Sequence, residues 1–123
     1  MSLFEGTSGQ SHVRDGHSTV VEQGVYVTSH SLERLRIQHP RAGVRGVLCL
    51  LAKAEEVEPG FIAPLLGRPL EAVRDRYFLS ADGWGVFVLA PARSGGPSMW
   101  VLVTYLRFGP YQREVARRLL VAA

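Results

Sequence analysis

The residues of this sequence with the greatest chemical capability lie together in segment 28–36, Thr-Ser-His-Ser-Leu-Glu-Arg-Leu-Arg. At about 3.6 residues per turn, His30 and Arg34 fall one turn apart on the same face of a helix, while the two leucines can pack inward. An imidazole can take or give a proton near neutral pH, and a guanidinium can hold a phosphate by two parallel hydrogen bonds. The spacing predicts a phosphate site, and a histidine that only caps the helix or lies on its surface is the competing interpretation.

The elements around this segment must hold it in place. β-Branched and aromatic residues at 25–28 predict a short strand, and either Thr28 or Ser29 can cap a helix over 30–39. Pro40 ends that helix and suits the first turn of a second one, which we expect over 41–56. Two shorter helical pieces are expected at 61–66 and 69–75.

The clearest β signal follows these helices. Segments 76–80 and 84–89 flank an Asp-Gly turn dipeptide and predict a tight hairpin. Segment 99–108 is long and apolar enough for a central strand, and 111–121 can form a closing helix. The fold class expected is therefore α+β, with N-terminal helices packed on one face of a mainly antiparallel sheet, a three-stranded meander, and a C-terminal helix.

Length and composition indicate a single domain. The chain has 123 residues and 46% hydrophobic content, enough to bury a core without disulfides. Residues 1–22 are rich in Gly, Ser, Thr and His and are expected to be a flexible lead-in, so that 23–123 form the single α+β domain. No Cys-x-x-Cys or His-Glu-x-x-His pattern accompanies the four histidines, so we expect neither a metal nor a cofactor.

Cysteine usage and hydropathy bear on the compartment. The single cysteine, Cys49, lies among apolar neighbours and is expected to be buried and inert. The longest apolar run, 47–52, is too short to cross a bilayer, and the first residues lack the layout of a signal peptide. We therefore expect a cytoplasmic protein without a membrane segment.

The charge distribution favours an anionic partner. From His30 onward there are thirteen basic and eight acidic residues, and arginine supplies all but one of the basic ones. Such a balance is typical of proteins that bind nucleic acid. The amino-acid bias of a high-GC genome is the competing explanation for the arginines.

The expected central strand offers two candidate site residues. Strict alternation places Thr104 on one side of the strand, and Tyr105 with Arg107 on the other. One sheet face is expected to be partly open, so either Thr104 or Tyr105 can face a groove.

A resemblance to a known family connects these segments. The residues Val-Thr-Ser-His-Ser-Leu-Glu-Arg at 27–34 precede a helical segment, an Asp-Gly hairpin and a strand that ends Val-Thr-Tyr at 103–105. This order resembles the RelE-like toxins, which belong to the barnase, EndoU and colicin D group of small metal-independent ribonucleases. Many relatives open with a His-x-x-x-Arg helix. The resemblance covers about residues 25–108.

The resemblance implies RNA cleavage in which the ribose 2′-hydroxyl attacks the neighbouring phosphate. It implies that His30 is the acid or base, that Arg34 and Arg76 hold the phosphate, and that Thr104 or Tyr105 orients it. The further residues expected to contact substrate are Arg74, Trp84 and Arg107. RNA and a cognate inhibitor or antitoxin are the implied partners. The chain departs from the family in its two-helix insertion at 41–74 and in having Arg where many relatives have Lys, and Arg is too basic to act as a general base.

Two other functions remain open. A non-catalytic module could bind nucleic acid or a protein through its arginines and exposed aromatics such as Trp84, Trp100 and Tyr111. An accessory protein could use an open sheet face or edge to form an oligomer of undetermined size. The ribonuclease reading requires that His30, Arg34, Arg76 and either Thr104 or Tyr105 meet in one cleft.

Overall fold

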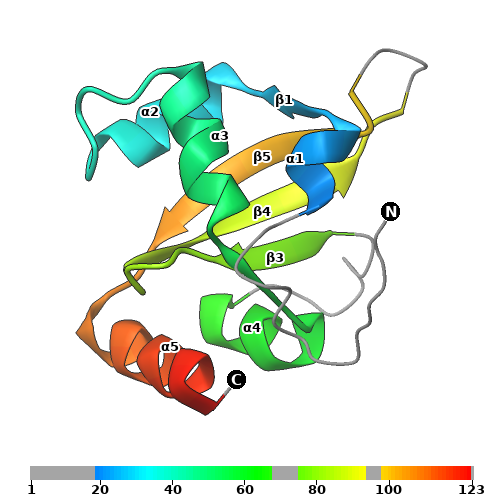
Figure 1. Ribbon diagram of the computed structural model, residues 1–123. Helices are drawn as coiled ribbons and strands as arrows, with labels where there is room; N and C mark the ends of the chain where they lie inside the picture. The colour runs from blue at the N-terminus through cyan, green and yellow to red at the C-terminus, as the bar shows by residue number, and fades with distance from the viewer. Residues whose placement is uncertain (1–18, 68–74, 94–97, 123) are drawn as a thin grey trace.

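The computed structural model describes residues 19–67, 75–93 and 98–122, and these form a five-stranded mixed sheet between two layers of helices (Figure 1). The strand order is β1-β5-β4-β3-β2. The strands are β1 (Val25–Val27), β2 (Glu55–Val57), β3 (Arg76–Leu79), β4 (Gly85–Pro91) and β5 (Trp100–Arg107). The helices are α1 (Thr19–Gln23), α2 (Ser29–Arg36), α3 (Val44–Ala52), α4 (Pro59–Leu66) and α5 (Pro110–Ala122). The expected α+β class is confirmed.

The expected antiparallel meander is present as β3, β4 and β5, which are consecutive neighbours in the sheet. Its hairpin contains Gly83 at φ 77°, a left-handed conformation that glycine adopts without strain. The meander is only the centre of the sheet, because β1 pairs parallel with β5 at one edge and β2 pairs antiparallel with β3 at the other.

Strand β2 replaces the end of a helix expected over 41–56. Helix α3 begins after Gly43 and ends at Ala52, where the N–H of Lys53 donates back to the carbonyls of the last turn. The next residues pair with β3 instead of continuing the helix. Two glutamates are poor strand formers, so the contact with β3 decides this conformation.

Both faces of the sheet are covered, which corrects the expectation of one partly open face. One core cluster joins α1, α2 and α3 to the sheet through residues that include Val20, Leu35 and Phe87. The other joins α4 and α5 to the opposite face through residues that include Ile62 and Val88. The central strands are apolar on both sides, as expected for strands buried between two layers.

A register shift in β5 changes which residues share a face. Val88 pairs with Thr104, but the next residue of β4, Leu89, pairs with Leu102, so Val103 is an extra residue in β5. Beyond this irregularity the alternation is reversed. Thr104 therefore lies opposite Val88 on the α4–α5 side, while both Leu102 and Tyr105 belong to the core under α1–α3.

The packed domain begins earlier than residue 23. Helix α1 starts at Thr19, and Val20 in it is fully buried against the α3 side of the core. The expected boundary at residue 22 is thus corrected for residues 19–22, and residues 1–18 lie outside the described part. The helical piece expected at 69–75 falls almost wholly on residues that are not described, whereas the piece at 61–66 is found within α4.

Candidate functional site

Helix α2 places the two residues of the predicted phosphate site on the protein surface. The Thr28 hydroxyl accepts a hydrogen bond from the Ser31 N–H at 3.1 Å and donates to the Leu102 carbonyl at 2.8 Å. One side chain therefore caps the helix and fastens its start to β5. His30 and Arg34 are both exposed, one turn apart, as the sequence predicts.

Arg76 has a structural role in β3. Its Nε donates to Glu56 Oε2 at 2.7 Å and its Nη2 to Glu56 Oε1 at 2.5 Å, which forms a bidentate ion pair with both side chains about three-quarters buried. The guanidinium also lies 4.8 Å from the centre of the Trp100 ring. The guanidinium is thus engaged by Glu56 and Trp100.

Thr104 and Tyr105 lie on opposite faces of the sheet. Thr104 is 6% exposed, and its Oγ1 has no hydrogen-bond partner among the described residues. Tyr105 is 1% exposed on the side of α2. Of the four positions that the ribonuclease hypothesis requires in one cleft, the described contacts therefore join none to another, because Arg76 is paired with Glu56 and the Tyr105 hydroxyl with Gln38.

The remaining predicted contacts are dispersed. Arg107 is exposed at the end of β5. Trp84 is 36% exposed and lies beneath the Arg113 guanidinium, 3.9 Å from the ring centre. Arg74 lies outside the described residues.

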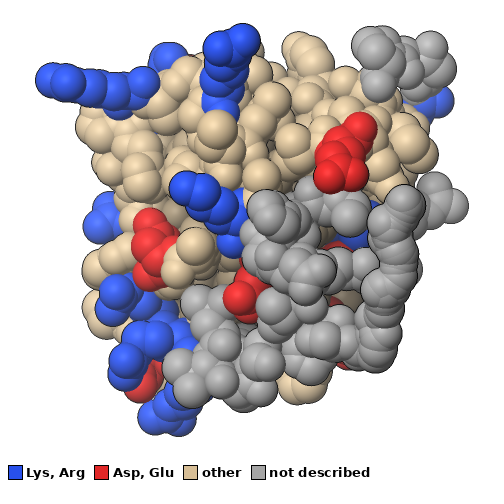
Figure 2. Space-filling view, in the orientation of Figure 1, with Lys and Arg blue, Asp and Glu red and all other residues tan. Residues whose placement is uncertain are grey.

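Positive charge is concentrated over α2, α3 and their connection, which together we call the α2–α3 face. Exposed residues between 29 and 53 include five cations and a single acid. Figure 2 shows Lys and Arg atoms over this part of the surface, and a further group over α5 at the lower left. The cations are Arg34, Arg36, Arg41, Arg45 and Lys53, and the acid is Glu33.

A small hollow lies beside the α2–α3 face, beyond the C-terminal end of α2. It has a volume of about 110 Å³, and its polar lining residues are His39, Lys53, Ser80, Asp82 and Tyr105. His39 also lines a shallower groove along α3. The histidine is therefore placed where two hollows adjoin.

The hairpin turn fixes the carboxylate of this hollow. Asp82 Oδ1 accepts hydrogen bonds from the Ser80 hydroxyl at 2.6 Å and from the Trp84 N–H at 2.9 Å. Its other oxygen, Oδ2, lies 3.9 Å from His39 Nε2. Ser80 donates its proton to Asp82, so the arrangement is not that of a serine nucleophile activated by histidine.

Tyr105 forms the inner wall of the hollow. Its hydroxyl donates to Gln38 Oε1 at 2.5 Å, and its ring packs so closely on Gly85 that a Cβ there would overlap it. Burial raises the pKa of Tyr105 to about 12. The phenol therefore stays protonated over the physiological pH range and acts as a hydrogen-bond donor.

The sequence predicts Tyr105 as a site residue but not the other polar residues of this hollow. It indicates His39 only as one of four histidines without a metal-binding pattern, and Asp82 only as a turn residue. No spacing rule connects them, because they are far apart in the chain and meet only when the β3–β4 turn packs beside the end of α2. The signal that was available is chemical: a second histidine at the end of the same helical segment as His30.

The α3 thiol is also placed differently from expectation. Cys49 is exposed and lines the groove beside Arg41. Val47 and Leu51, one turn apart, form the buried side of α3, and Cys49 lies between them in sequence and faces away. Apolar neighbours in sequence therefore do not predict burial on a helix.

The described residues contain no group of three or more His, Cys, Asp or Glu placed to hold a metal ion. None of the described helices has the length and hydropathy that crossing a bilayer requires.

No protein-family model matches the chain, and neither curated proteins nor solved structures show a significant match to it.

Proposed function

We propose that this protein binds RNA and that the α2–α3 face is the contact surface. The observation that carries the proposal is the segregation of charge, with five exposed cations and one acid between residues 29 and 53. Four of the five cations are arginines, whose planar guanidinium groups match phosphate oxygens in pairs. The resemblance of segment 27–34 to RelE-like toxins favours RNA as the anionic polymer.

An arginine-rich composition by itself does not account for this distribution. Residues 54 to 93 contain six acids and four bases, which is the opposite balance. A genome-wide preference for arginine would affect both parts of the chain alike. The difference between them supports a surface built for an anion.

Binding of a fluorescent single-stranded RNA oligonucleotide, followed by anisotropy over a series of salt concentrations, tests this proposal. If about four phosphates are contacted, the logarithm of the affinity falls with the logarithm of the salt concentration with a slope near −3. The triple variant Arg34→Glu/Arg41→Glu/Arg45→Glu is expected to bind about a hundredfold more weakly at low salt.

A matched control changes the net charge by the same amount elsewhere. In Arg93→Glu/Arg117→Glu/Arg118→Glu we expect the affinity for RNA to fall by no more than about threefold. Equal losses in the two triple variants would assign the binding to net charge, and the absence of binding by the wild-type protein would refute the proposal.

RNA cleavage is a second candidate function, favoured by the His39–Asp82 pair in the hollow beside the same face. His39 would take the proton of the 2′-hydroxyl while that oxygen bonds to phosphorus and the bond from phosphorus to the 5′-oxygen breaks. The products are a 2′,3′-cyclic phosphate and a 5′-hydroxyl, which takes its proton from water. Lys53, in the same hollow, would stabilise the charge that develops on the phosphate.

Incubation of RNA with the purified protein in a metal chelator, followed by end-group analysis, tests this candidate. Loss of cyclic-phosphate products in His39→Gln with retention in His30→Gln would support the hollow as the site. The reverse result would support the assignment that the resemblance implies. RNA that is bound but left intact by the wild-type protein would leave binding as the function.

A further inference from the structure

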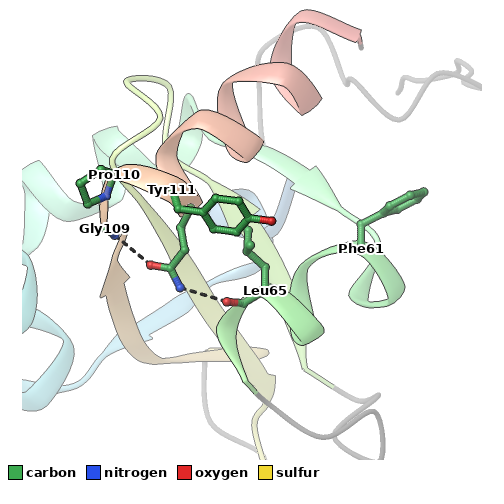
Figure 3. A pocket seen from close by; sticks show the side chains of 6 residues that line it. Phe61, Leu65, Gly109, Pro110 and Tyr111 are labelled. Atoms are coloured by element: carbon green, nitrogen blue, oxygen red, sulfur yellow. Dashed lines mark hydrogen bonds between the residues drawn. The ribbon is translucent and has the colours of Figure 1, made fainter.

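A second surface, on the other side of the sheet, has a different chemistry. An open groove of about 640 Å³ runs between α4 and the start of α5, lined by Phe61, Leu65, Gly109, Pro110, Tyr111 and Gln112. In Figure 3 the Tyr111 ring extends over Leu65 from α5, and Phe61 projects outward from α4. We call this surface the α4–α5 groove. Its volume can accept several side chains of a partner.

Gln112 fixes the two walls of the groove relative to each other. The side-chain Oε1 of Gln112 accepts a hydrogen bond from the Gly109 N–H at 2.8 Å, and its Nε2 donates to the Leu65 carbonyl at 2.9 Å (Figure 3). The first contact caps the start of α5, and the second ties α5 to the end of α4. The two walls are thus joined before any partner binds, which lowers the entropic cost of binding.

The groove exposes the two most exposed large hydrophobic side chains among the described residues. Tyr111 is 74% exposed and Phe61 is 63% exposed. A single exposed aromatic side chain is ordinary, but two that border the same apolar groove indicate an interaction surface. Aromatic side chains are also the residues that most often dominate the free energy of protein–protein association.

The charged residues beside the groove indicate the sign of the charge on the partner. None of the described residues that line it is charged. Along α5, Glu114 and Arg118 follow Tyr111 at i+3 and i+7, on the same side of the helix. Arg117 and Arg118 both lie next to Glu114, at 3.4 and 3.5 Å, so one carboxylate faces two guanidinium groups whose side chains are 61% and 78% exposed. Among the described residues, α5 therefore carries more positive than negative charge, whereas the exposed Glu58 precedes α4.

We propose that the α4–α5 groove binds a segment of another protein that places large apolar side chains against Phe61, Leu65 and Tyr111 and acidic side chains over α5. Single-stranded RNA fits less well, because its phosphates would need cations along the groove, and the lining provides none. A second copy of this chain fits less well too, because two basic α5 helices would face each other. The inference does not depend on RNA binding at the α2–α3 face.

Selection from a phage-displayed library of random peptides tests the proposal. The library is selected on the wild-type protein and counter-selected on Phe61→Ser/Tyr111→Ser, which changes only exposed side chains and therefore retains the fold. We expect enriched peptides to contain leucine or aromatic residues followed by aspartate or glutamate. Peptides without acidic residues, or no enrichment relative to the double variant, would overturn the proposal.

Labelled synthetic copies of the enriched peptides then provide affinities by fluorescence anisotropy. Tyr111→Ser and Phe61→Ser are each expected to weaken binding about tenfold, and Arg118→Glu about threefold to tenfold. Tyr26→Ser is the matched control, because Tyr26 is a 59% exposed aromatic residue on β1, and it should leave the affinity unchanged. An equal loss in that control would overturn the assignment to this groove.

Two further measurements distinguish the competing occupants of the groove. Displacement of the peptide by single-stranded oligouridylate from wild type and Arg34→Glu/Arg41→Glu/Arg45→Glu alike would make the groove an RNA site instead. Sedimentation that shows a wild-type dimer and a Tyr111→Ser monomer would make it a contact between copies of this chain. Either result would overturn the proposal.

Discussion

The two sides of the sheet present opposite kinds of surface to solvent. The α2–α3 face has five exposed cations and one acid, and beside it lies a small hollow whose lining includes His39 and Asp82. The α4–α5 groove has two exposed aromatic rings and no charged residue among its described lining. The layers beneath are equally apolar, so the difference arises from the outward residues of the helices.

This contrast separates two modes of recognition within one small domain. Salt screens the attraction between exposed charges and so weakens binding that depends on them. The free energy gained by burying aromatic side chains depends much less on salt. A salt titration therefore distinguishes the surfaces: binding at the α2–α3 face should weaken steeply with salt, and binding in the α4–α5 groove only slightly. The substitutions below test the contacts on the two sides of the sheet, through the stability of the protein and its interaction with RNA.

The largest effect is expected at Gly85, beneath the hollow of the α2–α3 side. A Cβ there would overlap the Tyr105 ring and lie 2.8 Å from the Leu106 carbonyl oxygen. Gly85→Ala should therefore lower the free energy of unfolding by about 3 kcal/mol, measured by urea denaturation. The control is Gly60→Ala in α4, where open space surrounds the site and the free energy should stay constant or rise by up to about 1 kcal/mol. Equal stability of the two variants would contradict this description of the Tyr105 contact.

The next effect concerns Tyr105 and pH. Burial raises its pKa to about 12 in the folded state, compared with about 10 in the unfolded chain. The contribution of the buried, protonated phenol to the free energy of unfolding is complete below about pH 10. It is lost as the pH rises through about 12, so the free energy of unfolding declines by about 2 to 3 kcal/mol. Urea denaturation at a series of alkaline pH values should show this decline in the wild-type protein and a smaller one in Tyr105→Phe. Parallel curves would show that Tyr105 is not its source.

Arg76 tests the predicted phosphate contact against the observed ion pair. Arg76→Met removes the two hydrogen bonds to Glu56 and leaves that largely buried carboxylate without its partner, so the free energy of unfolding should fall by about 1 to 2 kcal/mol. The affinity for RNA should stay within about twofold of wild type, because the residue is not on the α2–α3 face. A large loss of RNA binding by a protein that remains folded would restore Arg76 to the phosphate site.

The smallest effect is expected at Thr104, the sequence neighbour of Tyr105 on the opposite side of the sheet. Its hydroxyl is buried and lacks a hydrogen-bond partner among the described residues. Thr104→Val keeps the shape of the side chain and removes this polar atom, so the free energy of unfolding should rise by up to about 1 kcal/mol. RNA binding and cleavage should stay unchanged. Thermal unfolding and the RNA assays measure both quantities, and loss of cleavage would indicate that the hydroxyl contacts substrate.

Local patterns in the sequence were sufficient for the elements that local chemistry specifies. A cap at Thr28 or Ser29, a helix end before Pro40 and the Asp-Gly hairpin were all predicted, because each depends on neighbouring residues. Helix α2 nevertheless ends at Arg36, before the predicted end at His39. The placement of His30 and Arg34 on the outside of α2 followed from helical periodicity. The edge strand β2 was missed, because its glutamates take a strand conformation only through pairing with β3.

The candidate sites depended on contacts that no local pattern contains. The extra residue Val103 in β5 puts Leu102 and Thr104 on opposite faces of the sheet, where strict alternation would place them on the same face, and the bidentate pair with Glu56 engages Arg76. His39 and Asp82 approach each other only because the β3–β4 turn packs beside the end of α2. Phe61 and Tyr111 face a common groove only because Gln112 joins α5 to α4.

By itself, then, the sequence determined the α+β class, the meander, and an excess of positive charge on the segment that forms α2 and α3. Hydrophobic period, turn chemistry and charge are properties of neighbouring residues, which any conformation of the chain retains. The tertiary structure alone decided which side chains meet and which sheet face each one occupies. Those outcomes depend on strand register and on packing between distant segments, where one inserted residue moves every later side chain to the other side of the sheet.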